Sequence, residues 1–242
     1  MRRVLLLGGT HEGAAAAEAL NVLGLDVVTS LAGRTKVPRP PAGRVRVGGF
    51  GGVDGLTAYL ERERIDLLVD ATHPFAERIS GNAAKAASAI GLPRLCLYRP
   101  AWTARRDDRW VSARSIEHAA ELLPPGSKAL LALGRQYIAP FGVRSDLSFV
   151  VRTVDPFAPP FEAAVLVGRP SPDPNDERAM LGHHAITHVV SRNSGGQGAF
   201  AKIEAARLMG LPVIMIDRPP PPAPPLFAST DALVAAVAML RV

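Results

Sequence analysis

The stretch RVLLLGGTHEG, residues 3–13, decides the fold of this chain. Its apolar run is typical of a buried strand, and the glycines end the run too early for a signal peptide. A helical pattern over 12–23 follows. Set against G-x-G-x-x-G, Gly8 and Gly13 are in place and Thr10 replaces the middle glycine. Free N–H groups and the helix dipole there favour a phosphate. Gly8, Gly9 and Thr10 are therefore predicted to bind a nucleotide, although such glycines can also serve packing alone.

Short apolar segments alternate with helical patterns along the rest of the chain. This alternation is typical of parallel sheets covered by helices on both faces. We therefore predict an α/β protein with two Rossmann-like or flavodoxin-like parallel-sheet domains and the active site in the cleft between them. Strands are expected at 3–8, 26–31, 44–48, 66–71, 94–98, 128–133, 147–154, 163–167, 186–191 and 212–216, and helices at 12–23, 76–91, 115–123, 135–141, 198–209 and 230–240.

Composition limits the classes of function. The chain has 242 residues, 48% of them hydrophobic, and no apolar run reaches the roughly 18 residues of a membrane span. Its net charge of +6 fits a polyanionic ligand, and its 5% aromatic content gives little support for stacking on nucleic acid bases. The single cysteine, Cys96, cannot form an internal disulfide. We expect a cytoplasmic protein with no nucleic acid and no membrane partner.

The second strand indicates which nucleotide binds. An NAD site would place an acidic residue near its end, for the ribose hydroxyl groups. The chain instead has Ser30, Gly33, Arg34 and Thr35, which suit a 2′-phosphate and point to NADPH. Arg34 could also be an ordinary solvated base. The cluster Gly49, Phe50 and Gly51 follows the third strand and either lies against the cofactor or forms a plain turn.

The segment ATHPFA, 71–76, ends the fourth strand in an unusual way. Carboxyl ends of parallel strands meet at one edge of a sheet, so Thr72, His73, Pro74 and Phe75 should lie near the glycine loops. His73 has two interpretations. It is either a packed or capping histidine, or a ligand contact and proton donor.

The second half has a similar edge. Gly134 and Arg135 follow one strand, and SRNSGG (191–196) follows another and leads into a helix carrying Lys202. We expect Asn193, Ser194, Gly195 and Gly196 to form an anion-binding nest. The histidines 183, 184 and 188 lack a catalytic acid and run into a strand, so no metal is predicted.

Other enzyme classes lack their motifs here. The chain has no Tyr-x-x-x-Lys pair, no P-loop and no Gly-x-Ser-x-Gly elbow. The segment 99–112, rich in charged residues and tryptophan, interrupts the α/β pattern. We predict an N-terminal domain over 1–98 with the NADPH-binding loops, a linker over 99–112, and a C-terminal domain over 113–242 that contributes the substrate and cofactor cleft.

The ordered motifs together resemble one family, the precorrin-6A reductases of cobalamin (vitamin B12) biosynthesis. The matching segments are LLLGGTHEG (5–13), SLAGRT (30–35), VGGFGG (47–52), DATHPFA (70–76), YRPAW (98–102), LGRQ (133–136), SRNSGG (191–196) and AKIEAARLMGLPVIMIDRP (201–219). The resemblance implies hydride transfer from NADPH to the macrocycle precorrin-6A, giving precorrin-6B.

The proton source and the form of the substrate stay open. His73 is a candidate donor, but a substrate nitrogen or water would serve equally. Arg34, Arg135 and Lys202 are expected to hold negative charge on the anionic tetrapyrrole. The alternatives are a cobalt-precorrin-6A reductase, another NADPH-dependent reductase of an anionic substrate, and a non-catalytic NADP(H)-binding protein. A monomer or weak homo-oligomer is expected, with neighbouring pathway enzymes as conceivable partners.

Overall fold

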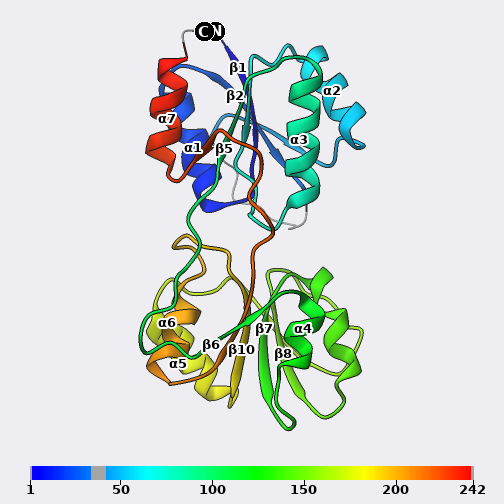
Figure 1. Cartoon of the computed structure of the whole chain (residues 1–242), viewed down its shortest axis with the longest axis vertical. Helices are drawn as coiled ribbons and strands as arrows, with labels where there is room; N and C mark the ends of the chain where they lie inside the picture. The colour runs from blue at the N-terminus through cyan, green and yellow to red at the C-terminus, as the bar shows by residue number, and fades with distance from the viewer. Residues whose placement is uncertain (1, 34–41, 241–242) are drawn as a thin grey trace. The chain divides into compact units, whose positions relative to one another are not determined.

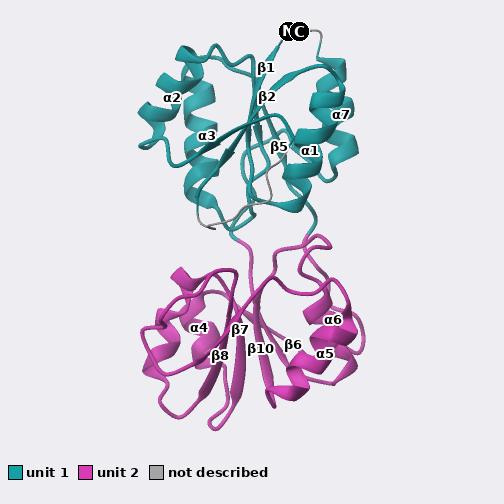
Figure 2. Ribbon diagram, turned by 180° about the vertical axis from the view of Figure 1, so that it is seen from behind, with its two compact units in different colours: residues 1–100, 219–242 teal, residues 101–218 magenta. Residues whose placement is uncertain are grey.

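The computed structural model describes residues 2–33 and 42–240. The chain forms two compact units, one of residues 1–100 and 219–242 and the other of residues 101–218 (Figure 2). This differs from the predicted division, in which 113–242 form one domain, because the C-terminal segment returns to the first unit. The expectation of an active site in a cleft between the two halves stays a prediction.

The first unit contains a six-stranded parallel sheet. Its strands are β1 (Arg3–Leu7), β2 (Asp26–Leu31), β3 (Arg44–Val47), β4 (Leu67–Asp70), β5 (Arg94–Leu97) and β12 (Leu226–Phe227). Their order is β12-β5-β4-β1-β2-β3, which is the Rossmann arrangement with β12 in the sixth place. The strands predicted from the sequence are confirmed to within two residues at either end, whereas β12 was not predicted.

Helices cover both faces of this sheet. Figure 1 shows α1 (His11–Val22) and α7 (Thr230–Met239) on one face and α2 (Val53–Arg62) and α3 (Glu77–Ala89) on the other. Each pair encloses a separate apolar cluster against the strands. The helix α2 was missed by sequence reasoning. Among the described residues, no helix is long and apolar enough to cross a bilayer.

The second unit repeats this plan. Its strands are β6 (Trp110–Ala113), β7 (Lys128–Ala132), β8 (Ser148–Thr153), β9 (Ala164–Val167), β10 (His188–Arg192) and β11 (Val213–Ile216), all parallel, in the order β6-β11-β10-β7-β8-β9. The strand β6 lies largely inside the stretch expected to be a linker. Its side chains alternate poorly in hydrophobicity because it occupies the edge of the sheet.

The α-helices of the second unit have six to ten residues. They are α4 (Ile116–Glu121), α5 (Pro174–His183) and α6 (Ala201–Leu208). The helix expected over 135–141 consists instead of two 3₁₀ turns, η1 (Arg135–Tyr137) and η2 (Ala139–Val143). Pro140 lacks the N–H that a continuous α-helix would use at this point, which accounts for the interruption. The helix α5 was not predicted.

The two units exchange their sixth strands. β6 follows β5 in the chain but pairs with β11, and β12 follows β11 but pairs with β5. Each of these strands leads into a helix capped by a serine, Ser115 before α4 and Ser229 before α7. The chain therefore passes between the units twice. The second sheet takes its strands β6 to β11 from one continuous segment, whereas the first sheet is completed by β12 from the C-terminal part of the chain.

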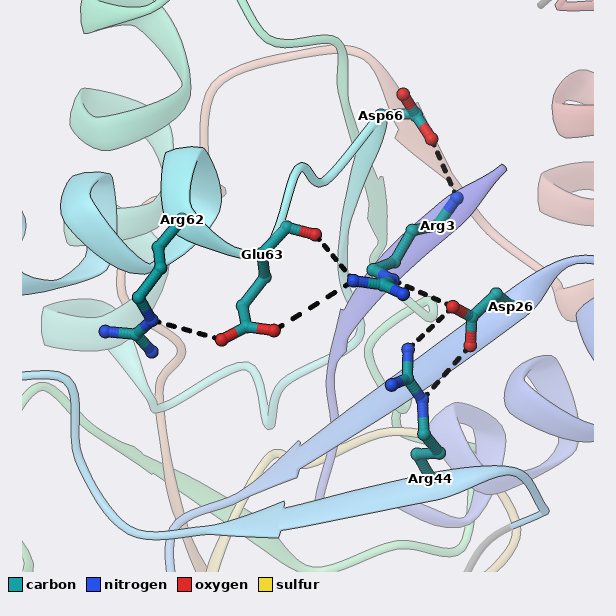
Figure 3. A network of polar contacts seen from close by, with 6 residues as sticks. All are labelled: Arg3, Asp26, Arg44, Arg62, Glu63 and Asp66. Carbon is teal, nitrogen blue, oxygen red and sulfur yellow. Dashed lines mark hydrogen bonds and ion pairs between the residues drawn. The ribbon is translucent and has the colours of Figure 1, made fainter. Parts of the chain in front are cut away.

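The amino edge of the first sheet is held by an ionic network (Figure 3). Asp26 at the start of β2 accepts from Arg3 Nε on β1 at 2.8 Å and from Arg44 Nη2 on β3 at 2.6 Å. Arg3 also donates to the backbone oxygen of Glu63 and, through its backbone N–H, to Asp66 ahead of β4. These contacts fix the strands at the edge opposite the carboxyl-edge loops.

Candidate functional site

The predicted site residues lie at the carboxyl edges of the two sheets. The chain order of the strands reverses between β1 and β4 in the first sheet and between β7 and β10 in the second. Ligands of open parallel sheets bind outside the carboxyl ends at such points. The first edge carries Gly8, Gly9, Thr10, Ser30, Gly33, Gly49, Phe50, Gly51 and Thr72–Phe75, and the second carries Gly134, Arg135 and Asn193–Gly196. Arg34 and Thr35 lie outside the described residues.

The β1–α1 loop is joined to the β4 loop across the reversal point. The Thr10 hydroxyl caps α1 by accepting from the Gly13 N–H at 2.9 Å and donates to the Ala71 carbonyl at 2.9 Å. A side chain on Gly13 would lie 3.2 Å from that same carbonyl, so glycine permits the close approach. The hydrogen of the hydroxyl is engaged by Ala71, and the predicted contact of Thr10 with a nucleotide stays a prediction. The N–H groups of the first turn of α1 remain for an anion.

An acidic side chain beside this turn is neutralised. Glu12 lies in the first turn of α1 and pairs with Arg99 Nη1 at 2.5 Å. Both side chains are largely buried, at 21% and 13% exposure. The contact joins two motifs of the sequence, GGTHEG and YRPAW, and removes a negative charge that would oppose a phosphate at the turn.

The ends of β2 and β3 present a base that sequence reasoning did not single out. The Ser30 hydroxyl accepts from Arg46 Nη1 at 2.9 Å. Arg46 also contacts the Gly49 carbonyl and the Phe50 ring. No acidic residue occupies the end of β2 among residues 29–33, which agrees with the sequence argument against an NAD site.

A pocket of about 220 Å³ opens beside the ends of β4 and β5. At its base, Asp70 is 1% exposed and accepts hydrogen bonds from the Thr72 N–H, the Thr72 hydroxyl and the Ser80 hydroxyl. Arg94 Nη1 lies 4.0 Å from the same carboxylate. The carboxylate therefore organises the β4 loop. The wall of the pocket includes Thr72, His73, Pro74, Glu77, Tyr98, Pro220, Pro222 and Ala223.

His73 lines this pocket, half-buried, in a defined orientation. Its Nδ1 accepts from the Phe75 N–H at 3.2 Å, so the neutral ring carries its proton on Nε2. The Phe75 ring lies 5.8 Å away, centroid to centroid. Cys96 also borders the pocket, but burial, and then the nearby Asp70 carboxylate, raise the pKa of its thiol to about 12. This cysteine stays protonated and is a poor nucleophile.

Asn193 has a structural role in the second unit. Its Oδ1 accepts from the Trp102 N–H at 2.8 Å and its Nδ2 donates to the Trp102 carbonyl at 2.9 Å. The Trp102 indole N–H donates to Gly196 O at 2.8 Å. Both ends of the Asn193 amide are therefore engaged within the protein, and the expected contact of Asn193 with substrate stays a prediction. The pairing anchors the SRNSGG loop to the YRPAW segment.

Lys202 is held inside the second unit, and its expected contact with substrate stays a prediction. It is 4% exposed and its Nζ donates to the Ala199 carbonyl at 2.7 Å, so the side chain does not present its charge at the surface. Burial lowers the pKa of Lys202 to about 7, although the nearby Glu177 opposes the shift. Glu177 is itself buried and accepts both contacts of Arg152 Nη1. Lys202 therefore stabilises the segment before α6 through its hydrogen bond to the Ala199 carbonyl.

Arginine accompanies the carboxyl end of every strand in the second sheet. Each lies in the last two residues of its strand or within three residues after it. Three of them are exposed at the edge, while Arg152 is paired with Glu177, Arg192 lies over the Tyr137 ring, and Arg218 donates to the Asn193 carbonyl. Only Arg135 was predicted from the sequence. The other arginines are far apart in the chain and come to lie along one edge only when the strands pair in the sheet. The exposed members are Arg114, Arg135 and Arg169.

The histidines considered for metal binding do not share one element. His183 ends α5 and His188 begins β10. Within residues 2–33 and 42–240, no group of three or more His, Cys, Asp or Glu side chains is arranged to hold a metal ion.

The doubled Rossmann plan, the nucleotide-type turn at α1 and the pocket beside β4 are typical of a dinucleotide-binding enzyme. The model of the family described as "Precorrin-6x reductase CbiJ/CobK" matches residues 3–238. The chain belongs to this family of oxidoreductases of cobalamin biosynthesis.

Individual relatives agree with the family. A protein of Rhodococcus erythropolis named precorrin-6A reductase is 44% identical over 98% of this chain and 97% of its own length. A solved structure titled "CobK precorrin-6A reductase" has a TM-score of 0.94 and 39% identity, covering 98% of this chain and 96% of that chain. A Priestia megaterium protein named cobalt-precorrin-6A reductase is 29% identical, covering 89% of this chain and 90% of its own.

Proposed function

We propose that this reductase uses NADPH to reduce precorrin-6A to precorrin-6B. The observation that carries the proposal is the 44% identity, over nearly the whole of both chains, to a relative of that name. The lower identity of 29% to the cobalt-precorrin-6A reductase supports the metal-free macrocycle as the substrate. We also propose a cytoplasmic location and a monomer or weak homo-oligomer.

The residues of the first unit fit a dinucleotide phosphate. The start of α1 is a helix N-terminus of the kind that favours an anion, Glu12 is neutralised by Arg99, and the end of β2 carries Ser30 in place of an acid. NADPH supplies the hydride when bound. A dinucleotide lies across the reversal point of such a sheet, with one half on each side. We therefore assign the pocket lined by Thr72, His73 and Tyr98 to the nicotinamide half.

The second unit suits a substrate with many carboxylates. Arg114, Arg135 and Arg169 are exposed after the ends of β6, β7 and β9, so they are spread across the carboxyl edge of the sheet, in which adjacent strands are about 4.8 Å apart. Guanidinium groups bind carboxylates through paired hydrogen bonds. We propose that these three arginines hold substrate carboxylates, while Asn193 and Lys202 keep the neighbouring loop in place.

His73 is proposed to deliver the proton that accompanies the hydride. The neutral ring accepts from the Phe75 N–H through Nδ1. The donor is the imidazolium, so Nδ1 gives up this contact to take a proton from solvent, and Nε2 then passes its proton to the substrate. General acids contribute about 10²- to 10⁴-fold to a rate. We expect His73→Ala to lower kcat by about 10²-fold or more. A decrease of less than about threefold would leave the proton to the substrate or water. His183→Ala, at the exposed end of α5 in the second unit, is the matched control.

The test of the function is an assay of precorrin-6A turnover in which the cofactor and the substrate are changed one at a time. NADPH consumption is followed by its near-ultraviolet absorbance, and the macrocycle by its visible spectrum. NADH replaces NADPH in one series, and cobalt-precorrin-6A replaces the substrate in another. Rapid NADPH loss together with a shifted macrocycle spectrum is the expected result. NADPH binding without oxidation would refute the proposed substrate, and faster oxidation with the cobalt form would reassign it.

A further inference from the structure

Arg46 is held at the one position of the first sheet where Rossmann proteins distinguish their cofactors. It pairs in register with Ser30, near the end of β2. Its Nη1 donates to the Ser30 hydroxyl and to the Gly48 carbonyl, both at 2.9 Å, and its Nη2 donates to the Gly49 carbonyl at 3.0 Å. The guanidinium is therefore fixed by three hydrogen bonds from two adjacent strands.

Aromatic contacts hold the same group from its face. The Arg46 guanidinium carbon lies 3.8 Å from the centroid of the Phe50 ring and 5.0 Å from that of Tyr59. The two rings meet edge to face with centroids 5.2 Å apart. Stacking of this kind stabilises arginine in a planar orientation without neutralising its charge.

The VGGFGG motif builds this support. The carbonyls of Gly48 and Gly49 accept the arginine, and Phe50 stacks upon it. The helix α2 follows closely, since a side chain on Gly55 would lie 1.8 Å from the Phe50 carbonyl oxygen. The glycines therefore position Arg46. The sequence had suggested that this loop lies against the cofactor or forms a plain turn.

Two donor positions of the guanidinium remain for a ligand. The contacts with Ser30, Gly48 and Gly49 use both hydrogens of Nη1 and one of Nη2 among the described residues. The other Nη2 hydrogen and the Nε hydrogen point along one edge of the planar group and can bind an anion in a bidentate manner. The acidic residue of β2, Asp26, lies at the opposite end of that strand and accepts hydrogen bonds from Arg3 and Arg44, so it does not pair with Arg46.

We propose that Arg46 binds the 2′-phosphate of NADPH and determines the preference for NADPH over NADH. This inference rests on the proposed use of NADPH. It assigns to a base on β3 the role that the sequence had given to Arg34. The guanidinium is positioned before the ligand arrives, so little side-chain entropy is lost when a phosphate binds.

The test compares two small probes, 2′,5′-ADP and 5′-AMP, by titration calorimetry on the full chain. They share the adenosine and the 5′-phosphate and differ in the 2′-phosphate. Arg46→Gln removes the charge, and Arg46→Lys keeps it without the planar fork. Arg44→Gln is the matched control, because Arg44 lies two residues earlier on β3 and pairs with Asp26.

We expect Arg46→Gln to weaken 2′,5′-ADP binding by about 10- to 100-fold, as for a lost hydrogen bond to a charged group. Binding of 5′-AMP should change by less than about twofold, and Arg46→Lys should be intermediate. A purely structural role would weaken both probes equally. An unchanged ratio of affinities in both Arg46 variants overturns the inference.

The same measurement separates this inference from the proposed function. If the native protein prefers 2′,5′-ADP and the Arg46 variants keep that preference, the NADPH proposal stands and the assignment of Arg46 is wrong. If the native protein shows no preference, the NADPH proposal fails and the inference fails with it. Circular dichroism melting of each variant identifies any loss of binding caused by unfolding.

Discussion

The C-terminal helix α7 is predicted to stabilise the first unit. It belongs to that unit, although more than a hundred residues of chain separate it from the N-terminal part. Leu233 on α7 is fully buried in the cluster that contains Leu20 of α1 and Leu97 of β5. Replacing a buried leucine by alanine removes its transfer free energy and leaves a cavity, at a cost of about 2.7–5 kcal/mol. Leu233→Ala should therefore destabilise the first unit by this amount.

Hydrogen exchange with mass spectrometry measures where the stability is lost. Each 1.4 kcal/mol changes an opening equilibrium about tenfold, so amides that exchange by unfolding of the first unit should exchange about 10²- to 10³-fold faster. Peptides covering β1 and β5 should show this change. Peptides covering β7 and β10 should keep their protection, since α7 belongs to the other unit.

The control is Met239→Ala on the same helix. Met239 is 82% exposed, so its truncation should leave exchange in both units unchanged. If Leu233→Ala instead releases β7 and β10 while β1 and β5 keep their protection, α7 belongs with the second unit, as the sequence had suggested. Equal losses in both would show that the two units unfold together.

Three further predictions concern ionisable groups. The contacts of Arg3 and Arg44 lower the pKa of Asp26, so Asp26→Asn should lower the free energy of unfolding above the ordinary pKa of the carboxyl group. The difference from the native protein, measured by chemical unfolding, should shrink as the pH falls through the lowered pKa. The pKa of Lys202 is about 7 in the folded protein and higher when unfolded, so the unfolding free energy should rise between about pH 7 and 10, less steeply in Lys202→Met. With a thiol pKa of about 12, Cys96 should react with a disulfide reagent at about pH 8 only after denaturant is added, and rapid reaction of the native protein would contradict its burial.

Local sequence patterns predicted most of the parallel strands because buried parallel strands are short and continuously apolar. The segments RVLLL and LLVD are examples, and both lie where expected. The edge strands β6 and β12 were missed, although the other edge strands, β3 and β9, were predicted. The segments WVSA and LF are short and have few aliphatic residues in a row, so they carry little hydrophobic signal. Their partners across the sheet are distant in sequence and leave no local trace.

The site was predictable in position but less so in role. The carboxyl ends of the strands follow from the α/β alternation, so Thr10, Asn193 and Lys202 were correctly expected near an edge. Their side chains are occupied by Ala71, Trp102 and Ala199, which no local pattern reveals. Arg46 was overlooked because it lies inside a strand pattern, and its importance appears only when β2 and β3 are paired.

The motifs that carry the family resemblance serve mainly to hold one another. GGTHEG binds YRPAW through Glu12 and Arg99, and YRPAW binds SRNSGG through Trp102 and Asn193. A change in one partner leaves the other with an unmatched charge or amide, which is costly in a part-buried position. We therefore expect specificity for cofactor and substrate to depend on residues outside these paired motifs, namely the exposed strand-end arginines and Arg46. These positions can alter ligand preference without disturbing the loops that support them.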